Sequence, residues 1–179
     1  GVTGRGGIAQ HWHRPEGRAV VTAGADVSQE ALESFKRNVN RDAFVTLDYH
    51  ELLARADIDA VAVTSPDFTH EEYVCAAFGA GKHVFCEKPM AITTEGCDCM
   101  LRAWKTSGKQ FMIGFNMRYM NIFRVMKDVV DSGVIGEVRK VDIWSGKNWG
   151  GGTRPEGSEP VPETLDWDLW LGPAPWRPY

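Results

Sequence analysis

The sequence predicts an α/β fold, a parallel sheet doubly wound with helices, followed by the start of a second α+β domain that is cut short. Short β-branched or apolar runs alternate with helical patterns through residue 116, which is typical of β-α-β units. The connections between these runs are short, and a glycine-rich turn opens the chain. In folds of this class, ligands bind beyond the carboxyl ends of the strands.

The expected strands and helices alternate along this first region. Strands are expected at residues 19–24, 44–46, 59–64, 83–86 and 111–115. Helices are expected at residues 28–38, 49–56, 70–82 and 93–109. Gly81 and Gly108 stand where the C-terminal caps of two of these helices belong.

The pattern changes after residue 116. Residues 121–133 predict an amphipathic helix closed by Gly133, and residues 136–144 predict a strand. Residues 146–179 are rich in Gly, Pro and Trp and show little periodicity. A lone strand does not make a stable sheet, and only Gly1-Val2-Thr3 remains of the strand that normally precedes a glycine-rich turn. We therefore expect residues 117–179 to be an incomplete second domain, and the chain to be a fragment of something longer.

The composition is that of an ordinary globular protein. The chain has 179 residues, of which 43% are hydrophobic and 25% charged. A net charge of −4 without a long basic block argues against a nucleic-acid or anionic-membrane partner and favours a small molecule. The four cysteines form no CxxC pair, so reduced thiols are expected. Cytoplasmic localisation is the default expectation, with export left open because the residues that would show a signal precede Gly1.

The opening turn has the spacing of a dinucleotide fingerprint, Gly4-x-Gly6-x-x-Ala9. Gly4 would allow a tight turn, Gly6 would let the backbone approach a pyrophosphate, and the next helix would direct N–H groups at the phosphates. Asp26 ends the next expected strand, near the spacing of about 20 residues at which an acid reaches the adenosine ribose. This arrangement predicts a Rossmann-type domain over residues 1–116 that prefers NAD to NADP. The alternative is that Asp26 or Ser28 only caps the following helix.

The apolar run at residues 83–86 ends abruptly in Glu87-Lys88-Pro89. In the predicted fold this segment, Asp26 and the glycine turn share one edge of the sheet. A cation at Lys88 would stabilise developing alkoxide charge on a substrate carbinol or exchange a proton with it. Pro89 disfavours helical geometry at Lys88, and the isomer of the Lys88-Pro89 bond is left open. The alternative is a solvated loop lysine followed by a proline that ends the strand.

Four segments together resemble one family of NAD(P)-dependent oxidoreductases, the glucose-fructose oxidoreductase, inositol dehydrogenase and rhizopine catabolism (Gfo/Idh/MocA) family. These segments read GVTGRGGIA, DIDAVAVTSPDFTH, AGKHVFCEKPMA and GFNMRY. The resemblance implies a Rossmann domain followed by a larger open-sheet domain that carries substrate and oligomer contacts. It implies a homo-oligomer, no metal, and a family histidine and aspartate for catalysis that lie beyond Tyr179.

The resemblance also implies which residues serve the site. Cofactor contacts are expected at Gly4, Arg5, Gly6, Gly7, Ile8, Asp26, Thr64, Ser65, Pro66, Asp67, His70, Glu87, Lys88, Asn116, Trp176 and Arg177. Lys88 is the expected catalytic residue, and Lys88 and Arg118 are expected to contact substrate. Two alternatives remain open: His70 only pairs with local backbone, and Trp176-Arg177 belongs to a surface loop anchored by buried tryptophans.

The function that these residues imply is hydride transfer between NAD(P) and a hydroxyl of a sugar, cyclitol or related polyol. A second class is an NAD-dependent glycosidase, which oxidises a sugar transiently, eliminates the leaving group and returns the hydride. A third class is a cofactor-binding regulator without chemistry, against which the intact Lys88 argues.

Overall fold

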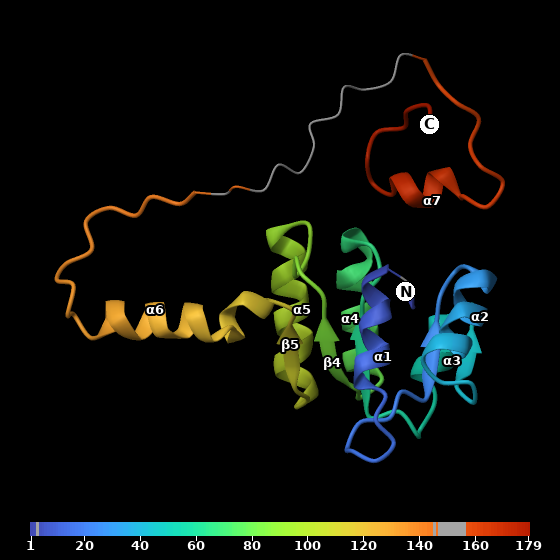
Figure 1. Ribbon diagram of the computed structural model, residues 1–179. Coiled ribbons are helices and arrows are strands. Elements are labelled where there is room, and N and C mark those ends of the chain that lie inside the picture. The colour runs from blue at the N-terminus through green and yellow to red at the C-terminus, as the bar shows by residue number, and fades with distance from the viewer. Residues whose placement is uncertain (3, 145, 147–156) are drawn as a thin grey trace. The chain divides into compact units, whose positions relative to one another are not determined.

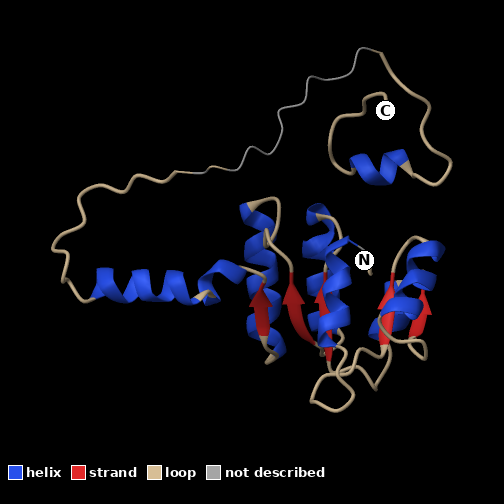
Figure 2. Ribbon diagram, in the orientation of Figure 1, coloured by secondary structure: helices blue, strands red, loops and turns tan. Residues whose placement is uncertain are grey.

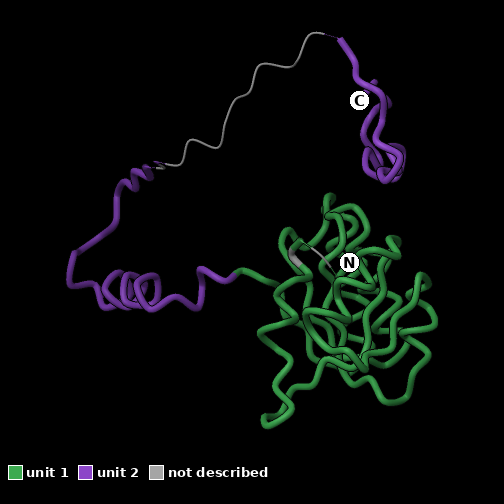
Figure 3. Tube along the Cα trace, turned by 45° about the vertical axis from the view of Figure 1, so that its right-hand side comes forward, with its two compact units in different colours: residues 1–115 green, residues 116–179 purple. Residues whose placement is uncertain are grey.

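The computed structural model describes residues 1–2, 4–144, 146 and 157–179. It divides into two compact units, residues 1–115 and residues 116–179 (Figure 3). All strands in the described part of the chain belong to the first unit. No helix in these described ranges is long and apolar enough to cross a membrane.

The strands of the first unit form two parallel sheets (Figures 1 and 2). The smaller sheet pairs β1 (Ala23–Ala25) with β2 (Phe44–Thr46). The larger has the order β3-β4-β5, with bounds Ala60–Val63, His83–Cys86 and Phe111–Ile113. Because every strand pair in these sheets is parallel, the predicted parallel α/β class is confirmed.

The helices of the first unit alternate with these strands. They are η1 (Gly4–Ile8), α1 (Ala9–Trp12), α2 (Gln29–Asn38), α3 (Tyr49–Leu53), η2 (Asp67–Thr69), α4 (His70–Gly79) and α5 (Thr94–Ser107). Gly81 and Gly108 have φ values of 71° and 67°, as expected for residues that end α4 and α5.

Side chains of β4 show that helices cover both faces of the larger sheet. Val84 and Cys86 point to one face and join a buried core with residues of α4 and α5. Phe85 points to the other face, where its ring meets Trp12 of α1 edge-on at a centroid distance of 5.2 Å. Successive residues of a strand face opposite sides, so the sheet is wound on both faces, as predicted.

A glycine brings α2 and the start of the chain close to β1. A Cβ atom on Gly24 would lie 2.8 Å from Cγ1 of Val2 and 2.9 Å from Cε1 of Phe35. Val2 and Phe35 belong to the second buried cluster, together with Leu32 of α2. The strand containing Gly24 is shorter than expected: residues 19–22 are not part of the sheet, and Ala19 instead forms an isolated antiparallel bridge with Arg14.

The second unit is described by three helical elements. These are η3 (Asn116–Tyr119), α6 (Asn121–Asp131) and α7 (Trp167–Leu171). The expected helix at 121–133 is confirmed, with Gly133 at a φ of 71° after its end. The strand predicted over residues 136–144 is wrong, because these residues adopt no strand. A strand requires a ladder partner, and the described residues of this unit contain no other strand to pair with it.

Candidate cofactor and active site

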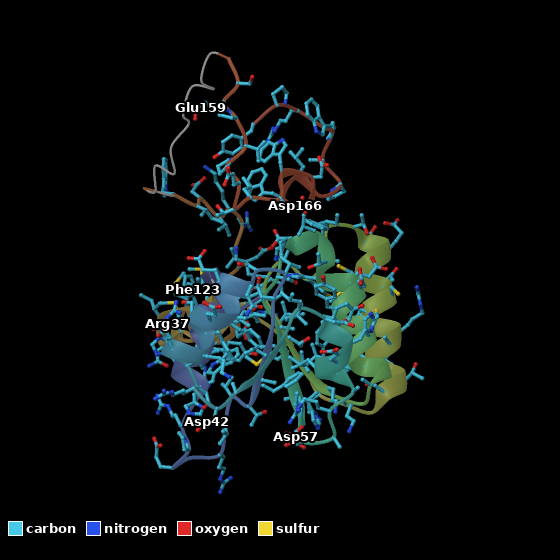
Figure 4. The ribbon with its side chains drawn as sticks, turned by 90° about the vertical axis from the view of Figure 1, so that its right-hand side faces the viewer. Arg37, Asp42, Asp57, Phe123, Glu159 and Asp166 are labelled. Atoms are coloured by element: carbon cyan, nitrogen blue, oxygen red, sulfur yellow. The ribbon has the colours of Figure 1, made fainter. Side chains whose placement is uncertain are left out.

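The residues expected to bind a dinucleotide follow the carboxyl ends of the strands. Asp26 follows β1, Thr64 follows β3, and Glu87 and Lys88 follow β4. The opposite edge is marked by residues that precede strands, such as Asp57 before β3, labelled in Figure 4. The sheet topology therefore places the expected site residues of the first unit along one edge.

Residues 1 and 2 connect the ends of the two sheets. The Val2 N–H donates to Oδ2 of Asp26 at 2.7 Å. The buried Thr64 hydroxyl donates to the carbonyl oxygen of Gly1 at 2.6 Å. These two bonds hold the segment that enters the glycine turn between β1 and β3. Spacing alone did not predict either bond, because each joins residues far apart in the sequence.

The glycines of the turn have different surroundings. Gly4 has a φ of 56°, a conformation that favours glycine. A Cβ on Gly6 would lie 2.4 Å from the carbonyl oxygen of Gly1, so this glycine allows the backbone to pack on itself. The glycine spacing predicts that Gly6 lets the backbone approach a pyrophosphate, but it does not predict this contact with Gly1. Apart from adjacent residues and the backbone of the same helix, no described atom lies within 4 Å of a Cβ built on Gly4 or on Gly7, so the turn is open at both glycines. The side chain of Arg5 lies outside the described part.

Asp26 has contacts that leave room for a further hydrogen-bonding partner. Its Oδ1 accepts the Ser28 N–H at 3.0 Å, and Ser28 Oγ accepts the Ala31 N–H at 3.3 Å as the cap of α2. The capping role is confirmed for Ser28, while contact of Asp26 with a ribose stays a prediction. A carboxylate has about four acceptor positions, and Asp26 is only half-buried. The acid thus fits a ribose that donates from its hydroxyls.

The loop after β3 is closed by hydrogen bonds of its own. The hydroxyls of Ser65 and Thr69 lie 2.6 Å apart, and the Thr69 hydroxyl also donates to the Pro66 carbonyl at 2.7 Å. Pro66 and Asp67 are exposed on this loop. The backbone-pairing alternative for His70 is what the structure shows: its side chain is fully buried and both ring nitrogens face backbone carbonyl oxygens.

The two charged residues that follow β4, Glu87 and Lys88, differ in burial. Glu87 is buried, and its Oε2 accepts the Lys88 N–H at 3.1 Å. A Cβ on Gly114 would lie 3.2 Å from Cδ of Glu87, so Gly114 makes room for the carboxylate. Lys88 itself is exposed at the edge, and the Lys88-Pro89 peptide bond is cis. No sequence pattern near Gly114 predicted that this glycine makes room for the Glu87 carboxylate.

Cys86 precedes this pair and is unsuited to act as a nucleophile. Its thiol is fully buried and lies 3.2 Å from the Glu87 carbonyl oxygen, to which it donates. Burial, with smaller contributions from Glu87 and Asp67, raises the pKa of Cys86 to about 12. A thiol is nucleophilic as its thiolate, so this residue is structural.

The raised pKa predicts a loss of stability in alkali. Between about pH 9 and pH 12 the unfolded thiol is ionised while the folded one keeps its proton. The folded state then binds more protons, so the free energy of unfolding falls as pH rises, by up to about 1.4 kcal/mol per pH unit. Urea unfolding of wild type and Cys86→Val from pH 8 to 11 should show a shallower fall in the variant. Equal slopes would contradict the assignment to Cys86.

The expected site residues of the second unit are described within that unit only. Asn116 and Arg118 lie exposed in η3. Trp176 is 70% exposed, and the Arg177 carbonyl oxygen accepts the Trp167 Nε1–H at 2.7 Å. Trp167 is half-buried and stacks on the exposed Trp170 at a centroid distance of 4.9 Å. Contact of these residues with a cofactor stays a prediction.

Parallel strands with helices on both faces, a glycine turn at the start and an acid directly after β1 are typical of a dinucleotide-binding Rossmann domain. Residues 1–115 match the family model GFO_IDH_MocA, described as an oxidoreductase family with an NAD-binding Rossmann fold, and residues 120–179 match the model of its C-terminal alpha/beta domain. The chain therefore belongs to the GFO_IDH_MocA family of oxidoreductases, as the sequence motifs indicated.

Individual relatives agree with this membership. Over 142 residues the chain is 42% identical to an inositol 2-dehydrogenase of Pseudomonas savastanoi pv. phaseolicola, covering 76% of this chain and 42% of that protein. A probable dehydrogenase from Thermotoga maritima is 34% identical at a TM-score of 0.67, covering 76% and 40% of the two chains. A scyllo-inositol dehydrogenase from Lactobacillus casei, solved with NAD(H) and scyllo-inositol, is 31% identical at 0.69, covering 75% and 40%. The chain thus spans less than half the length of these relatives.

Proposed function

We propose that the full-length protein is an NAD-dependent dehydrogenase that oxidises a ring hydroxyl of a cyclitol such as inositol. The observation that carries this proposal is the exposed Lys88, which follows the carboxyl end of β4 as Asp26 follows that of β1. The similarity to inositol 2-dehydrogenases supports the choice of a cyclitol over other polyols. NAD is favoured over NADP because the carboxylate of Asp26 would repel a 2′-phosphate.

The first unit offers groups for the ribose and the pyrophosphate of the cofactor. Asp26 would accept hydrogen bonds from the ribose, and the glycine turn, open at Gly4 and Gly7, would face the pyrophosphate. Pro66 and Asp67 are exposed in the loop after β3, which follows the carboxyl end of that strand. Bound NAD would supply the hydride acceptor that the side chains lack.

Lys88 would act on the oxygen of the substrate carbinol. Oxidation would pass a hydride from the carbinol carbon to bound NAD and the hydroxyl proton to water, so negative charge would develop on the oxygen as the proton leaves. The Lys88 ammonium would stabilise this charge by a hydrogen bond. The buried Glu87 accepts the Lys88 backbone N–H and so fixes the start of the lysine segment. Asn116, Trp176 and Arg177 remain expected cofactor contacts, and Arg118 remains an expected substrate contact.

The proposal is tested by spectroscopy of the full-length protein. We expect net absorbance growth at 340 nm when excess NAD is added with myo- or scyllo-inositol, and a weaker response with NADP. The matched control is the same mixture without polyol. NAD that co-purifies and shows no net reduction, together with release of the leaving group from an aryl glycoside, would contradict the proposal and support the glycosidase alternative.

We also propose that the full-length protein is a homo-oligomer. Light scattering on the same sample measures the oligomeric state, which is expected to exceed a monomer.

A further inference from the structure

The fully buried His70 connects two of the segments that carry expected site residues, the loop after β3 and the segment after β4. It begins α4, directly after the loop that follows β3. Its Nδ1 lies 2.8 Å from the carbonyl oxygen of Pro89, and its Nε2 lies 3.1 Å from the carbonyl oxygen of Ser65. One imidazole therefore touches the segment after β3 and the segment after β4 at once.

The chemistry of these contacts makes the imidazole a hydrogen-bond donor toward the loops. A backbone carbonyl oxygen only accepts, and an imidazole has one N–H when neutral and two when protonated. At least one contact is therefore a donated hydrogen bond in either state, and the shorter contact is the one to Pro89. Because Pro89 directly follows Lys88, this bond restrains the backbone on the C-terminal side of the lysine.

The same contacts argue against direct binding of a cofactor by His70. Its side chain is fully buried, and both ring nitrogens lie within hydrogen-bonding distance of the protein's own backbone. A dinucleotide could reach the ring only if one of the two loops moved away. The influence of His70 on the site must therefore pass through Ser65 and Pro89.

We propose that His70 is a positioning residue, which fastens the loop after β3 to the Lys88-Pro89 segment and so sets the position of the Lys88 amine. The other side of this segment is restrained by Glu87, which accepts the Lys88 N–H. Lys88 is thus held between a buried carboxylate and a buried imidazole, while its own side chain stays exposed. This inference rests on the function proposed for Lys88.

Three substitutions in the full-length protein separate the two contacts. In His70→Asn the amide can reach toward Pro89 from near the Nδ1 position, and in His70→Gln it can reach toward Ser65 from near the Nε2 position. His70→Leu removes both donors. The matched control is Val74→Ala, a fully buried position four residues along the same helix whose side chain belongs to the apolar core.

Steady-state kinetics with inositol should separate positioning from stability. We expect His70→Leu and His70→Gln to lower kcat by about 100-fold, the effect of a displacement near 1 Å at a reacting group. KM for NAD should change much less, His70→Asn should restore most of kcat, and Val74→Ala should lower the Tm without lowering kcat. Equal kcat values for Asn, Gln and Leu would overturn the positioning role.

Hydrogen exchange tests the positioning role of His70 even if inositol is not the substrate. Amide exchange in residues 87–92 should accelerate in His70→Gln and His70→Leu, but not in Val74→Ala. In the wild type, a slowly exchanging imidazole N–H of His70 should be visible by ¹H–¹⁵N spectroscopy, which requires no variant to fold. Absence of that protected proton would contradict the positioning role of His70. A protected proton in a protein that does not oxidise inositol would refute only the proposed substrate.

Discussion

Replacing Lys88 with methionine is expected to lower kcat for polyol oxidation by about 10²- to 10³-fold, the usual effect of removing one donor that stabilises a developing oxyanion. Methionine keeps an unbranched side chain of similar length, so the exposed position should fold normally. The affinity for NAD should fall far less than kcat, because in the proposed site Asp26 and the glycine turn would bind the adenosine half. Stopped-flow measurement of NADH formation separates the chemical step from product release.

Two further variants make this test specific. Lys88→Arg retains a cation but places it in a planar fork at a different reach, so partial activity is expected. Lys105→Met removes an exposed lysine from the last turn of α5, at the far end of that helix from the candidate site, and should leave kcat unchanged. A Lys88→Met variant with wild-type kcat would contradict the role of Lys88 in the chemical step and leave this lysine as an ordinary loop residue.

Local patterns were sufficient to predict most of the first unit. The apolar runs at 44–46 and 83–86 coincide with β2 and β4. Ser28 caps the start of α2 by accepting a backbone N–H, as serine often does. Gly108 ends α5 with a φ of 67°, a conformation that favours glycine. Such features depend on neighbours within a few residues, which is why a single sequence contains them.

Features that depend on distant partners were not predictable in the same way. The apolar alternation at 136–144 suggested a strand, but strand formation depends on a partner that the pattern itself cannot specify. The contact of Thr64 with Gly1 and the space that Gly114 leaves for Glu87 both join segments that the chain brings together only on folding. The sequence could therefore indicate which residue types meet at the sheet edge, while the contacts that position them required the structure.

Replacing Asp26 with alanine is expected to weaken NAD binding by about 10- to 150-fold, corresponding to the loss of about 1.5–3 kcal/mol from hydrogen bonds to a charged acceptor. The same change removes a negative charge that opposes the 2′-phosphate, so NADP should lose much less affinity than NAD. The preference for NAD should therefore narrow or reverse. Isothermal titration of both cofactors against wild type and variant measures the two affinities directly.

Asp26→Asn is the variant that separates ribose recognition from the support of the glycine turn. Its side-chain oxygen can still accept the Val2 N–H, which Asp26 binds at 2.7 Å, but the charge is gone. If the carboxylate reads the ribose, Asn should shift preference toward NADP as Ala does, and Asp42→Ala at the opposite edge should not (Figure 4). If Asp26 only supports the turn, Asn should bind both cofactors like wild type and Ala should lose both equally. The ratio of the two affinities thus identifies the role of the acid.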